Sequence, residues 1–93
     1  MRSIIQTDDD RCFECRNAFG TDWHHIFGGS PNRLLSEEDG LKVRLCRACH
    51  EEIHHGEKCK DLMEKYHKLG QTKWEAVYGT REEFVKRYGR NWL

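Results

Sequence analysis

The sequence predicts a small α+β domain reinforced by a structural zinc ion, and three observations support this fold class. Two Cys-x-x-Cys pairs, Cys12–Cys15 and Cys46–Cys49, enclose a segment whose composition favours two β-strands. After Cys46 the spacing of apolar residues changes to the helical period. The chain has only 93 residues, 37% of them hydrophobic, which is a size at which a metal often supplements a small core.

The first half of the chain is expected to form a β-hairpin preceded by loops. Residues 1–11 read as a loose arm and residues 12–20 as a zinc-knuckle-type loop. Residues 23–27 are rich in aromatic and β-branched side chains and predict a strand. The Gly-Gly-Ser-Pro-Asn run at 28–32 is a strong breaker that should end this strand in a loop.

Two further elements are expected between this loop and the second cysteine pair. Residues 36–40 predict a turn or a single helical turn. Residues 41–45 alternate apolar and basic side chains, which predicts the second strand.

The second half predicts four short helices, each followed by a glycine that would end it. They are expected over residues 48–55, over residues 61–69 with Gly70 as the stop, around Trp74 up to Gly79, and before Gly89. Thr80 and Glu83 have the spacing of a capping box for the last helix. We therefore expect a zinc-clamped core over residues 1–56 and a helical C-terminal extension over residues 57–93, packed on or beside it.

The composition bounds the function without identifying it. Sixteen Lys and Arg balance 16 Asp and Glu, so no global basic field indicates nucleic acid. Residues 56–93 carry nine basic against six acidic residues, a small local excess. No stretch is apolar enough to span a bilayer and no signal-peptide pattern opens the chain, so we expect a cytoplasmic protein that is neither secreted nor bound in a membrane.

The cysteines predict a structural zinc site. Five cysteines without an export signal favour metal binding over disulfides. Cys12, Cys15, Cys46 and Cys49 supply four thiolates, and the x-x spacing lets both sulfurs of each pair reach one tetrahedral ion. The filled shell leaves no position for water, so its role would be structural. Cys59 is left over and is expected to be a partly buried free thiol.

Four histidines suggest a second, open metal site. His50 and His54 are four residues apart on an expected helix and so share a face. His24 and His25 are adjacent on an expected strand, so one can be a ligand while its neighbour has another role. A neutral imidazole also suits general-base chemistry near pH 7. The alternative is that the histidines are only hydrogen-bonding partners around a zinc scaffold.

These motifs resemble a known family. His24-His25-Ile26, the run 45–50 (Leu-Cys-Arg-Ala-Cys-His) and His54 resemble the HNH, or ββα-metal, endonucleases, in their cysteine-clamped subgroup. The resemblance covers about residues 12–56. The segments 81–84 and 89–93 are more loosely similar to the tails of small phage- and prophage-borne HNH-like proteins.

The resemblance implies a DNA endonuclease with a ββα-metal core, and it assigns roles to individual residues. His25 would be the general base, and His24, His50 and His54 would hold a catalytic divalent metal such as Mg²⁺, Mn²⁺, Ni²⁺ or Zn²⁺. Asp22 would orient an imidazole or touch the metal. The residues expected to bind phosphate are Arg33, Lys42, Arg44 and Arg47, although the glutamates at 37, 38, 51 and 52 are available to pair with arginines instead.

The chain departs from the family at one position. The asparagine that orients the general base in the family corresponds by spacing to Leu41, whose side chain cannot form a hydrogen bond. We expect Asn32 to substitute, with Asp39 or a backbone carbonyl as alternatives.

Two other functions remain open from the sequence. A non-catalytic HNH-like scaffold would bind DNA or a protein partner, and Leu41 favours it. For the nuclease, so small a domain has little room to read a DNA sequence, and a phage or host protein partner or a homodimer is expected to supply specificity. A retroviral-type zinc knuckle would bind single-stranded nucleic acid through Cys46, Cys49, His54 and Cys59, but it leaves Cys12 and Cys15 without a role.

Overall fold

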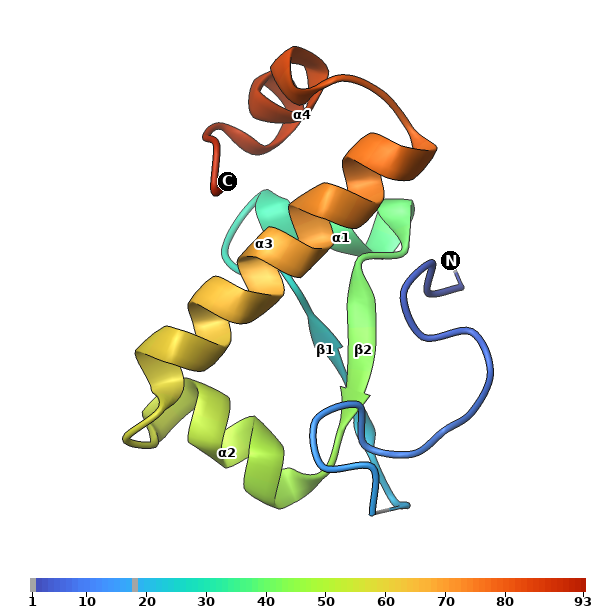
Figure 1. Ribbon diagram of the computed structural model, residues 1–93, viewed down its shortest axis with the longest axis vertical. Coiled ribbons are helices and arrows are strands. Elements are labelled where there is room, and N and C mark those ends of the chain that lie inside the picture. Colours follow the sequence, from blue (N-terminus) through green and yellow to red (C-terminus); the bar gives the residue numbers. More distant parts are fainter. Residues whose placement is uncertain (1, 18) are drawn as a thin grey trace.

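The computed structural model describes residues 2–17 and 19–93, and within them the chain forms a two-stranded antiparallel sheet and four helices (Figure 1). In chain order the elements are β1 (Asp22–His25), α1 (Asn32–Asp39), β2 (Lys42–Leu45), α2 (Arg47–His55), α3 (Cys59–Val77) and α4 (Arg81–Tyr88). The predicted small α+β fold is confirmed at this level. None of the helices in the described part of the chain has the length and apolar character that crossing a bilayer requires.

The hairpin separates its side chains onto two faces. His24 pairs with Val43, and His25 pairs with Lys42 in the antiparallel register. Since directly opposed residues point to the same side of a sheet, His24 lies on the face of the buried Val43, and His25 lies on the opposite face with Lys42. The two adjacent histidines therefore serve different environments, as the strand prediction required.

The first strand is shorter than predicted because the chain turns into the core after His25. Ile26 still donates its amide to the carbonyl of Leu41 at 2.9 Å. Ile26 and Phe27 are both 1% exposed, so the apolar residues that suggested a longer strand are core residues instead.

The turn expected around residues 36–40 is the end of an eight-residue helix, α1. Ser36 is buried inside it, where its hydroxyl accepts from the Phe27 amide and donates to the Phe27 carbonyl, both at 3.1 Å. Gly40 ends the helix with φ of 74°, and a Cβ at this position would collide with the carbonyl of Arg2. The expected turn or single helical turn was therefore too short, since the helix begins at Asn32 and Ser36 lies inside it, bound to the backbone of Phe27.

Gly70 does not end a helix, which corrects the prediction of two helices between residues 61 and 79. The 19-residue helix α3 runs through it and crosses the molecule above the hairpin (Figure 1). A Cβ on Gly70 would lie 2.6 Å from Cγ2 of Ile26 and 3.1 Å from Phe27. The absence of a side chain at Gly70 therefore lets α3 pack closely against Ile26 and Phe27, the two residues that follow β1.

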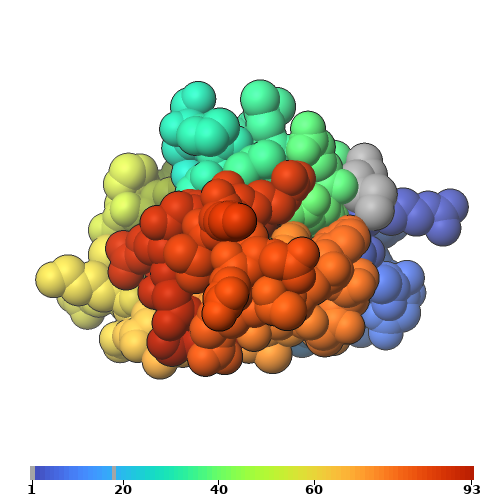
Figure 2. All heavy atoms as spheres, turned by 90° about the horizontal axis from the view of Figure 1, so that it is seen from above, coloured from blue at the N-terminus to red at the C-terminus, as the bar shows by residue number. Residues whose placement is uncertain are grey.

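Residues on both sides of position 56 share one core. Phe84 and Trp92 pack against Phe27, with ring centroids 5.5 and 4.5 Å away. Asp39, at the end of α1, accepts hydrogen bonds from the side chains of Trp74, Arg87 and Tyr88. Figure 2 shows the end of α3 and the C-terminal segment covering this end of the molecule beside α1. These contacts fix the helical half against the hairpin that carries the candidate site.

Candidate metal centres and their surroundings

The four predicted zinc ligands come together. The Sγ atoms of Cys12, Cys15, Cys46 and Cys49 all lie within 4.8 Å of one another, and those of Cys15 and Cys46 are 4.0 Å apart. A tetrahedral ion with Zn–S bonds of about 2.3 Å places its sulfurs about 3.8 Å apart. The cluster is compatible with a structural zinc site, as the cysteine spacing predicted.

The cysteine cluster joins three parts of the chain. Cys12 and Cys15 lie in the turn before β1, where the Phe13 amide donates to the carbonyl of Arg44 on β2 at 2.7 Å. Cys46 directly follows β2 as the N-cap of α2, and Cys49 lies in the first turn of that helix. An ion held here would tie the start of α2 to the hairpin and to the N-terminal arm.

The surroundings of the thiols differ in their effect on charge. Burial opposes ionisation of Cys12, but the backbone amides of Cys15 and Cys46 outweigh it and lower the pKa of its thiol to about 6. Burial and the neighbouring cysteines raise the pKa of Cys49. Several thiolates at this spacing repel one another without a cation, so metal binding at this cluster would be coupled to proton release.

The three predicted histidine ligands form a second cluster. One ring nitrogen from each of His24, His50 and His54 lies within 4.8 Å of the others. The rings meet edge-on, with centroids 4.8 to 5.5 Å apart. His24 comes from the core face of β1, whereas His50 and His54 project from one face of α2 because they are four residues apart.

A buried nitrogen in this cluster is unsatisfied by the protein. Within the described residues, His24 Nε2 is buried and has no hydrogen-bond partner, a situation that costs about 1–3 kcal/mol. Burial, assisted by the nearby His50 and His54, lowers the pKa of His24 to about 4. The imidazole is therefore neutral at pH 7 and keeps a lone pair for a metal. Three nitrogen donors with an open position are typical of catalytic metal sites, so the cluster fits a divalent ion.

Two hollows open onto the histidine cluster. One of about 220 Å³ is lined by His24, His50 and His54 together with His25 and Arg33. The other, of about 440 Å³, is lined by His50 and His54 together with Asp22 and Arg47. Asp22 and two of the four predicted phosphate-binding cations therefore border the cluster.

His25 is held by a residue that the sequence reasoning did not select. Its Nε2 lies 2.8 Å from Glu37 Oε1, and Glu37 also accepts from Lys42 Nζ at 2.9 and 3.1 Å. The hydrogen bond from His25, followed by that from Lys42, lowers the pKa of Glu37 to about 2. Ionised Glu37 can only accept, so His25 Nε2 carries a proton, and in the neutral imidazole Nδ1 is then the acceptor nitrogen.

The residues expected to orient His25 have other partners. Asn32 donates to the backbone carbonyl of Tyr88 at 3.1 Å, and Asp39 belongs to the network with Trp74, Arg87 and Tyr88. Leu41 is fully buried in the core. The expectation for Asn32 was therefore wrong. The sequence did not indicate Glu37 as the partner of His25, because the neighbouring segment was predicted to be a turn. Helix α1 places the Glu37 carboxylate against the face of the hairpin that carries His25.

The other two predicted phosphate-binding cations are engaged within the protein. Lys42 is only 6% exposed and is bound to Glu37. The Arg44 guanidinium lies 4.2 Å from the ring centre of Trp23 and donates to the carbonyl of Thr21 at 3.3 Å. Arg33 and Arg47 are exposed and border the histidine hollows, so they are the better candidates for contact with an anion.

The geometry does not match the zinc-knuckle alternative. Cys46 and Cys49 are grouped with Cys12 and Cys15, whereas His54 belongs to the histidine cluster. Cys59 lies in neither group and is a half-buried free thiol at the first residue of α3, as expected.

Comparisons of the chain with protein-family models, with curated proteins and with solved structures gave no match. The functional conclusion below therefore depends on the residues of this chain and on their geometry.

Proposed function

We propose that this protein is a metal-dependent DNA endonuclease of the HNH type, which hydrolyses or nicks phosphodiester bonds. The observation that carries the proposal is the buried Nε2 of His24, which has no protein partner within the described residues and is grouped with the ring nitrogens of His50 and His54. This group is separate from a four-cysteine cluster that can close around its own ion. One closed site and one open site in the same small fold are what the HNH resemblance implies.

Each residue near the open site has a chemical role in this proposal. His24, His50 and His54 would hold a divalent cation, which when bound stabilises negative charge on the phosphate and on the leaving oxygen. His25 would take a proton from the attacking water, because a neutral imidazole is a suitable general base. Arg33 and Arg47 would position phosphates of the DNA on either side of the histidine cluster.

Glu37 would replace the orienting asparagine that the chain lacks. Its hydrogen bond to His25 Nε2 fixes the ring and its tautomer, so that Nδ1 is the nitrogen able to accept the proton of water. Lys42 is bonded to both carboxylate oxygens and keeps Glu37 ionised. Because β1 has one neighbouring strand within the described residues, its other edge gives His25 access to the hollow that is also lined by the three proposed histidine ligands.

A non-catalytic scaffold that binds DNA or a protein partner is the second candidate, and buried Leu41 at the asparagine position favours it. Nicking of supercoiled plasmid separates the two functions. The assay compares wild type, His25→Ala and His50→Ala in Mg²⁺, Mn²⁺, Ni²⁺ or no added metal, with His55→Ala as the matched control. Nicking that requires metal and is lost in the first two variants alone supports the nuclease. No nicking by folded, zinc-loaded wild type indicates the scaffold.

A further inference from the structure

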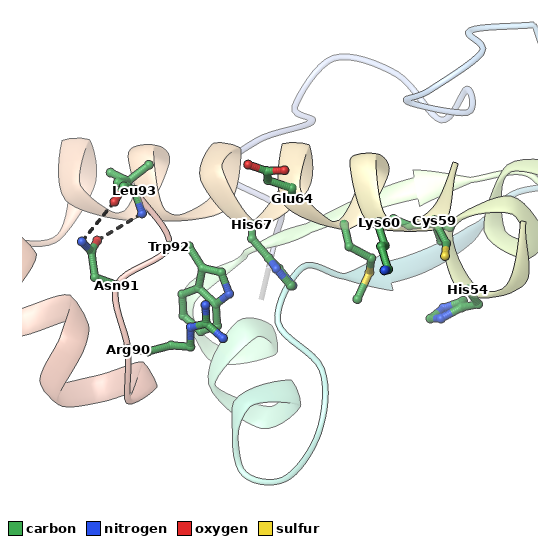
Figure 3. Close-up of a pocket in the computed structure, with 11 residues that line it drawn as sticks. His54, Cys59, Lys60, Glu64, His67, Arg90, Asn91, Trp92 and Leu93 are labelled. Atoms are coloured by element: carbon green, nitrogen blue, oxygen red, sulfur yellow. Dashed lines mark hydrogen bonds between the residues drawn. The ribbon is translucent and has the colours of Figure 1, made fainter. Parts of the chain in front are cut away.

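A third hollow begins at the histidine cluster and follows α3 to the end of the chain. It has a volume of about 610 Å³ and lies between α3 and the C-terminal segment, with His54 at one end and Arg90 and Trp92 toward the other (Figure 3). Met63 lines both this hollow and the one shared by His24, His25 and Arg33. The hollow therefore adjoins the candidate catalytic site.

One wall is a single face of α3. Lys60, Met63 and His67 are spaced i, i+3 and i+7, which places them in a row. Seven residues at about 1.5 Å each give about 10.5 Å between Lys60 and His67. That length accommodates two or three nucleotides at a rise of about 3.4 Å per step of one strand.

The opposite wall supplies an aromatic surface and a second cation. The Trp92 ring is partly exposed, and its centre lies 5.2 Å from that of the His67 ring. The Arg90 guanidinium lies 5.0 Å from the centre of the Trp92 ring. Lys60 and Arg90 are exposed, whereas the one glutamate of the lining, Glu64, is paired with Lys68 at 2.9 Å. Cations next to an aromatic surface are the usual combination for binding single-stranded nucleic acid.

We propose that this hollow binds two or three unpaired nucleotides next to the scissile phosphate, and this inference rests on the nuclease function proposed above. Lys60 and Arg90 contact the phosphates, and a base stacks against Trp92 and His67. Bases inside an intact duplex are already stacked and paired, so they cannot reach this surface. The preferred DNA is therefore single-stranded, gapped or flapped beside the cleavage position.

Binding is tested without cleavage in the His50→Ala protein, with no added divalent metal. The probes are a fluorescein-labelled 12-nucleotide DNA strand of mixed sequence and the matching blunt duplex. Binding of each probe is measured by fluorescence anisotropy at several salt concentrations. In this background the double variant Lys60→Ala/Arg90→Ala is compared with Arg2→Ala/Lys86→Ala, which removes the same charge from exposed positions outside the hollow.

The single strand is expected to bind more tightly than the duplex. Losing two phosphate contacts lowers the salt slope for the single strand by about 1.4, which at 0.1 M salt corresponds to about 25-fold weaker binding. The control double variant keeps the original slope. DNA should also quench tryptophan fluorescence in this protein, and the quench should be reduced in Trp92→Phe and kept in Trp74→Phe, which changes a buried ring outside the hollow.

Equal loss in the two double variants, or tighter binding of the duplex, overturns the inference. Plasmid nicking is measured separately, in protein that keeps His50. This separates failure of the strand-site inference from failure of the nuclease proposal. If nicking occurs but the Lys60/Arg90 pair does not affect strand binding, the hollow is not the strand site. If strand binding depends on this pair but wild type never nicks, the strand site stands and the nuclease proposal fails.

Discussion

The four-cysteine cluster should determine whether the histidine cluster exists, and Cys49→Ser tests this dependence. Cys49 and His50 are consecutive residues of α2. Fixing the backbone of the nine residues of α2 costs about 9–18 kcal/mol of conformational entropy, only part of which its hydrogen bonds recover. Ile53 is its one fully buried side chain, worth about 1.5–3 kcal/mol. We therefore expect so short a helix to depend on metal ligation, which is worth about 10–16 kcal/mol at structural zinc sites.

Cys49→Ser should therefore unfold α2 and separate His50 and His54 from His24. The helices of the described part of the chain contain 44 residues, of which nine belong to α2, so the helical circular dichroism signal should fall by about a fifth. Calorimetric titration with Ni²⁺ should show at least a tenfold loss of affinity at the histidine cluster. Cys59→Ser, which changes a thiol outside both clusters, is the matched control. Unchanged helix content and Ni²⁺ affinity in Cys49→Ser would refute this reasoning.

Three further substitutions test the contacts that position the site. For the proposed nuclease, Glu37→Gln should lower single-turnover plasmid nicking about 10–100-fold, because it weakens the hydrogen bond to His25, the proposed general base. Glu38→Gln, at an exposed position, should leave the rate unchanged. Gly70→Ala should lower the free energy of unfolding, measured in urea, by about 1–3 kcal/mol, because the added methyl group overpacks against Ile26 and Phe27. If it stabilises the protein as much as Thr72→Ala does at an exposed position, α3 does not approach these residues closely. Asp39→Ala should lower the free energy of unfolding by about 2–6 kcal/mol, because the buried indole N–H of Trp74 and the buried hydroxyl of Tyr88 lose their acceptor. A loss no larger than that caused by Glu38→Ala would show that the network is not needed.

The two clusters of candidate metal ligands were predictable because their geometry is local. Two residues between cysteines, or three between histidines on a helix, fix the relative position of the donors before any tertiary contact forms. Alternation along β1 likewise separated His24 from His25. What remained was to bring these pairs together, and the antiparallel hairpin followed by α2 does so.

The hydrogen-bond partner of His25 and the course of α3 were not predictable by the same reasoning. Glu37 reaches His25 only because α1 forms, and α1 depends on the hydrogen bonds between Ser36 and the distant backbone of Phe27. Gly70 resembles a helix stop in the sequence, but it lies within α3, where the absence of a side chain allows the helix to pack on Ile26. In both cases a contact across the fold overrides a local preference.

The most direct test of this account is the number of metal ions that the protein binds. Equilibrium dialysis against Zn²⁺ near pH 7, followed by elemental analysis, should give two ions per chain for wild type and for His55→Ala. It should give one for His50→Ala, because the four-cysteine cluster remains intact. A single ion in wild type that His50→Ala leaves unchanged would show that the histidine cluster does not bind Zn²⁺, and would contradict the account.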